Sequence, residues 1–88
     1  LFTGMNDKVP FEIADIIVFP NPGKNTLNIQ SALKELTVYL FNQEGKQLLS
    51  WSFDGNTAIQ TGNLKPGVYL YHVVQKDSII KTGKWIKE

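Results

Sequence analysis

The fold is decided by the stretch Leu64-Lys65-Pro66-Gly67-Val68-Tyr69-Leu70-Tyr71-His72-Val73-Val74-Gln75. Pro66 and Gly67 have the backbone preferences of a tight turn that leads into a strand. Side chains alternate along an extended chain, and here both alternating sets are apolar, so both faces are expected to be covered. The stretch therefore predicts a strand at the centre of a sheet, not at its rim.

Other segments on both sides of this strand alternate in the same way and are separated by turn residues every 8 to 12 positions. The expected strands are 11–19, 26–30, 36–42, 46–53, 57–61, 67–75 and 78–86. The residues expected to point inward are Leu27, Ile29, Leu49, Trp51 and Phe53. Leu36, Val38 and Leu40 share one side of their strand, and Ile59 is the centre of a short one. A single sheet of this many strands would leave one apolar face in water, at about 25 cal/mol per Å². The pattern predicts an all-β fold, a small immunoglobulin-like antiparallel β-sandwich of about seven short strands.

Composition excludes several classes of protein. The 88 residues are enough for one domain, and nine lysines against eight carboxylates, with no arginine, do not favour nucleic-acid binding. No apolar run approaches the roughly 20 residues of a membrane-spanning helix, and no cysteine is present for a disulfide. Residues 1–10 have no sustained periodicity, so we expect a linker or lead-in there and a domain over 11–88. Since the chain starts at Leu1 without a leader, it is expected to be part of a longer protein.

The residues do not form a catalytic motif. His72 is the only side chain that titrates near neutral pH in its ordinary state, and it lies alone in mid-strand, where a packed histidine is the expected role. The eight carboxylates are scattered, mostly in turns and at strand ends, and no segment supplies the six or more oxygen ligands of a calcium site. The sequence therefore predicts no enzyme, no metal and no cofactor.

Aromatic and lysine residues have two possible roles. Trp51, Tyr69 and Tyr71 are in phase with core positions, whereas Tyr39 and Trp85 remain open candidates for an exposed, sugar-stacking surface. Lys81, Lys84 and Lys87 lie on the last strand, where lysine ordinarily protects a sheet edge from pairing with another chain.

The order of the motifs resembles a known family. The motifs are, in order, Val18-Phe19-Pro20-Asn21-Pro22, Leu27-Asn28-Ile29, Val38 to Lys46, Leu64 to Tyr69 and Lys81 to Lys87. From about Ile16 to the last residue, the chain resembles the type A C-terminal sorting domain of the Bacteroidetes type IX secretion system. One departure is the turn that begins at Asn42, where the family usually has Asp; Asn can make the same bond to the backbone.

The resemblance implies a set of recognition or motif residues. They are Pro20, Asn21 and Pro22 of the corner, Asn42 and Gly45 of a turn, Gly67 and Tyr69 of the central strand, and Lys81, Lys84 and Lys87 of the last strand. It also implies a cargo domain upstream, passage through the periplasm, recognition by the outer-membrane apparatus, removal by a sortase-like peptidase, and delivery to the cell surface or the medium.

Two hypotheses follow from these sequence patterns. In the first, the last strand, 78–87, is the recognition element, and deletion of Lys84 to Glu88 blocks secretion while the fold largely persists. In the second, the chain is an immunoglobulin-like or fibronectin-like accessory module of a secreted enzyme that binds carbohydrate through Tyr39 or Trp85.

Overall fold

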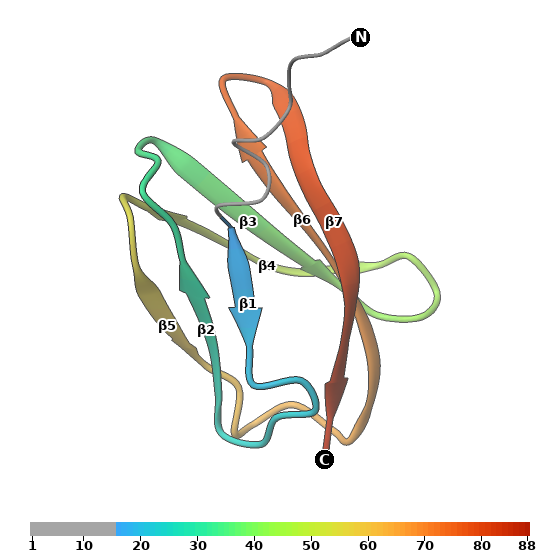
Figure 1. Cartoon of the computed structure of the whole chain (residues 1–88). Coiled ribbons are helices and arrows are strands. Elements are labelled where there is room, and N and C mark those ends of the chain that lie inside the picture. The colour runs from blue at the N-terminus through green and yellow to red at the C-terminus, as the bar shows by residue number, and fades with distance from the viewer. Residues whose placement is uncertain (1–15) are drawn as a thin grey trace, which may run out of the picture.

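The computed structural model describes residues 16–88, which form seven strands and no helix (Figure 1). The strands are β1 (Ile17–Phe19), β2 (Thr26–Gln30), β3 (Leu36–Phe41), β4 (Gln47–Phe53), β5 (Thr57–Gln60), β6 (Gly67–Gln75) and β7 (Ser78–Lys87). The expected first strand, 11–19, and the expected boundary between residues 10 and 11 lie wholly or partly outside the described residues. Within the described range, no helix could cross a lipid bilayer.

The seven strands form two antiparallel sheets. One sheet has the order β1-β2-β5 and the other β4-β3-β6-β7, so the chain passes repeatedly from one sheet to the other. The hairpin expected from 36–42 and 46–53 is present as β3 and β4, with Val38 opposite Trp51. These features confirm the prediction of a small antiparallel β-sandwich.

Strand β6 occupies an inner position between β3 and β7, as predicted. Tyr69, Tyr71 and Val73 are buried on the face that meets the other sheet. The expectation that the opposite face is also covered is wrong, because the second sheet lies on one side only. On that outer face the Leu70 side chain is 36% exposed.

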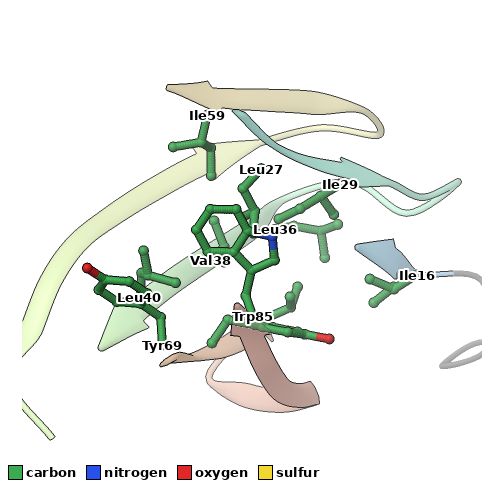
Figure 2. Packing of buried hydrophobic residues seen from close by; sticks show 11 residues of the cluster. Ile16, Leu27, Ile29, Leu36, Val38, Leu40, Ile59, Tyr69 and Trp85 are labelled. Carbon is green, nitrogen blue, oxygen red and sulfur yellow. The ribbon is translucent and has the colours of Figure 1, made fainter. Parts of the chain in front are cut away.

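Trp85 is the largest fully buried side chain of the core (Figure 2). The other buried apolar residues are Ile16, Leu27, Ile29, Leu36, Val38, Leu40, Ile59, Tyr69, Tyr71 and Val73. The indole Nε1 of Trp85 donates a hydrogen bond to the Pro20 carbonyl oxygen at 2.7 Å, so the polar atom of this buried ring has a partner. Trp85 therefore cannot belong to an exposed aromatic surface, and that part of the carbohydrate-binding hypothesis is wrong.

The prediction that Trp51 lies in the core is wrong. Its side chain does share the inner face with its cross-strand partner Val38, but 45% of it is exposed. The reason is its position: β4 is an edge strand of the larger sheet and has a neighbouring strand, β3, on one side only. The indole Nε1 of Trp51 reaches β5, where it donates to Thr57 Oγ1 at 2.8 Å.

Candidate functional site

Strand β7 and the segment that runs along its C-terminal half form the candidate site. β7 is the other edge strand of the larger sheet, opposite β4, and pairs with β6 over its whole length. Part of the segment between β1 and β2, Pro20–Gly23, which we call the proline corner, lies beside the end of β7 (Figure 1). Both X-Pro bonds of the corner, Phe19–Pro20 and Asn21–Pro22, are cis.

The side chain of Asn21 binds the outer edge of β7 as a neighbouring strand would. Its Nδ2 donates to the Lys84 carbonyl oxygen at 2.8 Å, and its Oδ1 accepts from the Ile86 backbone N–H at 3.1 Å. An amide side chain carries the same donor and acceptor as a peptide group, so it can replace one peptide unit of a sheet ladder. Asn21 therefore satisfies two edge groups that an adjacent strand would otherwise bind.

Gly23 continues this pairing with its own backbone. Its N–H donates to the Ile86 carbonyl oxygen and its carbonyl oxygen accepts from the Glu88 N–H, both at 2.8 Å, in a parallel bridge with Lys87. A Cβ at position 23 would lie 2.8 Å from the Trp85 ring and 2.9 Å from the Pro20 carbonyl oxygen. Glycine is therefore required here because the corner approaches β7 too closely for a side chain.

The three lysines of β7 have different environments. Lys84 is exposed on the outer face, Lys81 is half-buried, and Lys87 is only 8% exposed. The Nζ of Lys87 donates to the Glu88 carbonyl oxygen at 3.1 Å. Lys84 is therefore the one exposed member of this set.

The Gly67 and Tyr69 pair belongs to the same region. Gly67 lies opposite Lys87 and Tyr69 opposite Trp85 across the β6–β7 ladder. The Tyr69 and Trp85 rings are 6.2 Å apart at 43°, and the Tyr69 hydroxyl donates to the Lys65 carbonyl oxygen at 2.5 Å. Tyr69 thus fixes the turn that leads into β6 and also supports the Trp85 ring.

The turn at Asn42 forms as the sequence predicts but lies elsewhere. Asn42 Oδ1 accepts hydrogen bonds from the backbone N–H groups of Glu44 and Lys46, each at 2.9 Å, which is the expected Asx bonding. Gly45 has a φ of +88°, a conformation that favours glycine. This turn joins β3 to β4, whereas the proline corner and Gly67 meet at the C-terminal end of β7. The structure therefore does not bring all the predicted motif residues together.

One pair of residues near the site was missed by the sequence reasoning. Gly83 lies opposite Tyr71, and a Cβ at Gly83 would be 2.6 Å from the Tyr71 hydroxyl oxygen. The Tyr71 ring thus fills the space that a side chain at position 83 would need, and burial raises the pKa of its hydroxyl above the usual 10.0. A glycine inside a predicted strand is a signal of such close approach.

The structure gives the lone histidine a packing role. The His72 ring lies 4.8 Å from the Phe41 ring at 54°, on the outer face of the larger sheet. Among residues 16–88, no group of three histidine or carboxylate side chains is close enough to bind a metal ion.

A comparison with protein families shows which family the chain belongs to. Residues 17–88 match the family model described as the secretion system C-terminal sorting domain. The chain belongs to this family. The sorting-domain match begins at the first residue of β1 and includes both the proline corner and β7. A comparison with curated protein sequences finds no matching relative.

Membership gives this sorting domain a role as a secretion signal, which favours a non-catalytic function. It also implies contact with a secretion system and a cargo protein that continues from its N-terminal side. A sorting domain of this kind is associated with transit to the outer membrane and with the cell surface or secretion.

Proposed function

We propose that this sorting domain directs an attached cargo protein through the type IX secretion system of a Bacteroidetes cell, as a type A domain. The family match over residues 17–88 is the observation that carries the proposal. The fold supports it, because a sorting signal needs a stable surface that a receptor can read and does not need an active site. The cargo would pass through the periplasm and end on the cell surface or in the medium.

The recognition surface in this proposal is β7 together with the proline corner. Lys84 is its exposed charge, and the corner fixes the backbone of residues 84–88 next to it. Lys87 is only 8% exposed, so in this proposal it contributes mainly to the packing at the end of the sandwich. The exposure of Lys81 is intermediate between those of Lys84 and Lys87.

The truncation expected from the sequence does not separate recognition from folding. Deleting Lys84 to Glu88 removes Trp85, the largest buried side chain, together with every backbone partner of the proline corner. Loss of a buried tryptophan costs about 3–5 kcal/mol, a large fraction of the stability of a small domain. Point substitutions at exposed positions are therefore the appropriate test of recognition.

We also propose that residues 1–10 link the domain to its cargo and contain or adjoin the point at which a sortase-like peptidase removes the domain. Those residues lie outside the described part of the chain, so the proposal rests on their composition and on the family. N-terminal sequencing of the released domain tests it. A cleavage point within the folded sandwich would contradict it.

A fusion experiment tests the sorting role. Residues 1–88 are placed behind a signal peptide and a fluorescent reporter in a host with a working type IX system, and in a matched strain that lacks the system. The proposal predicts reporter at the surface or in the medium of the first strain only. Retention of a folded fusion in the periplasm of both strains would contradict it.

A further inference from the structure

The two sheets have four edge strands, and three of them are protected from pairing with another chain. β1 and β5 are short, with three and four residues. The C-terminal half of β7 is covered by Asn21 and Gly23, and its remaining part carries lysine. Short length, a covering segment and lysine are the usual means by which proteins prevent edge-to-edge association.

The fourth edge, β4, has none of these means of protection along most of its length. Its sequence, Gln-Leu-Leu-Ser-Trp-Ser-Phe, contains no charged residue and no proline. Among residues 16–88, its outer edge has no neighbouring strand. Two large apolar side chains on this strand are exposed, Leu48 at 38% and Trp51 at 45%. A strand of this kind is a template for the addition of another strand.

The irregularity of β4 defines which part can pair. The register with β3 shifts between Leu40 and Phe41, so Leu48 is the extra residue on β4 and a bulge disturbs the edge there. Leu49 to Phe53 remain in regular register. Trp51 is the middle residue of this regular segment.

We propose that β4 pairs with β4 of a second copy of this chain, antiparallel, about a two-fold axis at Trp51. In this arrangement Trp51 lies opposite Trp51 of the second copy, Leu49 opposite its Phe53, and Ser50 opposite its Ser52. The two four-stranded sheets then form one continuous sheet of eight strands. The interface is isologous, which is the usual form of a homodimer contact.

The side chains favour a second copy as the occupant. Leu49, Trp51 and Phe53 lie on one face of β4 and Ser50 and Ser52 on the other, so each apolar residue meets an apolar residue and each serine a serine. No like charges oppose one another, and paired aromatic side chains across strands are favourable. The pairing also covers the exposed surface of Trp51, which nothing in the described part of the chain does.

Sedimentation equilibrium of the 88-residue chain tests the proposal. We expect a mass that rises with concentration to twice that of the single chain. Trp51→Lys and Trp51→Glu place like charges together at the axis, so each variant alone is expected to stay monomeric, whereas their mixture forms a dimer again. Thr82→Lys, on the exposed outer face of the opposite edge strand, is the matched control and is expected to dimerise as the unmodified chain does.

A second pair of variants covers the case in which Trp51 substitutions unfold the chain. Ser50→Lys/Ser52→Lys and Ser50→Glu/Ser52→Glu change only exposed positions, and their mixture is expected to restore a dimer that each lacks alone. Because the chain has no cysteine, the register can also be tested: a mixture of Ser50→Cys and Ser52→Cys chains should form an intermolecular disulfide more readily than either alone.

Two results would overturn the proposal. One is a single-chain mass at every concentration. Pairing of β4 with residues 1–15 of the same chain would give this result and would equally overturn the proposal. The other is a dimer that persists in all four charge variants, because that dimer would form through a different surface.

Discussion

The side-chain amide of Asn21 forms two hydrogen bonds with the backbone of β7, 63 and 65 residues away: Nδ2 to the Lys84 carbonyl oxygen at 2.8 Å and Oδ1 from the Ile86 N–H at 3.1 Å. Through this contact the Pro-Asn-Pro corner, far from the C-terminus in sequence, covers half of an edge strand. The corner and the last strand, which the sequence motifs treat separately, are thus one structural unit.

Replacement of Asn21 should measure the strength of this contact. Asn21→Ala removes both hydrogen bonds, and because the site is exposed, water can bind the freed groups, so we expect a loss of about 1 kcal/mol in the free energy of unfolding. Asn21→Asp keeps the acceptor for Ile86 but places a carboxylate oxygen in front of the Lys84 carbonyl oxygen, where the two repel, so its loss should be at least as large as that of Asn21→Ala. Chemical denaturation measures both. An unchanged midpoint for Asn21→Ala would show that the contact does not stabilise the fold.

Gly23 should tolerate no side chain. Gly23→Ala places a Cβ 2.8 Å from the Trp85 ring and 2.9 Å from the Pro20 carbonyl oxygen, so we expect a destabilisation of about 1–3 kcal/mol from overpacking. Gly62→Ala is the matched control, because its nearest neighbour would be Asn25 Oδ1 at 3.6 Å. Equal unfolding midpoints for the two variants would contradict the close approach of the corner to β7.

Replacement of Trp85 should destabilise the fold much more than replacement of Trp51. Trp85→Ala empties the centre of the core, with an expected loss of about 3–5 kcal/mol. Trp51→Ala removes a ring that is 45% exposed and one hydrogen bond to Thr57, so a smaller loss of about 1–2 kcal/mol is expected. Thermal unfolding at low protein concentration, where single chains dominate, makes the comparison. The reverse order would mean that the burial pattern described for β4 and β7 is wrong.

Burial of Tyr71 should affect stability at high pH. Because burial raises its pKa above 10.0, the unfolded chain loses the hydroxyl proton at lower pH than the folded chain does. The contribution of Tyr71 to the free energy of unfolding is therefore constant below about pH 10. It falls as the pH rises from there towards the folded-state pKa. The decline in unfolding free energy in this window should be less steep in Tyr71→Phe than in the unmodified chain. Identical pH profiles would contradict the buried environment of the hydroxyl.

The strands could be predicted where the alternation of apolar residues in the sequence matches their burial in the structure. Leu27 and Ile29 of β2, and Leu36, Val38 and Leu40 of β3, alternate strictly and are all buried. Turn chemistry was equally informative, since Asn42 makes the expected backbone hydrogen bonds. In these segments the period of the apolar residues and the geometry of the turn specify the same structure.

The predictions of burial fail where the order of the strands in the sheet determines which side chains are covered. Alternation placed Trp51 on the correct face but could not show that β4 is an edge strand, and it could not place Trp85 in the core because the lysines around it obscure the pattern. The link from Asn21 to β7 joins residues more than 60 positions apart, and no local signal encodes that distance. Alternation puts Lys84 and Lys87 on opposite faces of the last strand, but only the structure shows that the Lys87 face is the buried one.

Charge reversal at Lys84 tests the proposal that β7 and the proline corner form the surface read during secretion. The measurement is export of the reporter fusion carrying Lys84→Glu, with Lys34→Glu, an exposed lysine in the β2–β3 loop, as the matched control, after both variants are shown to fold by thermal unfolding. We expect Lys84→Glu to remain folded and to be exported less, while Lys34→Glu is exported normally. Equal export of the two folded variants would contradict the assignment of this surface.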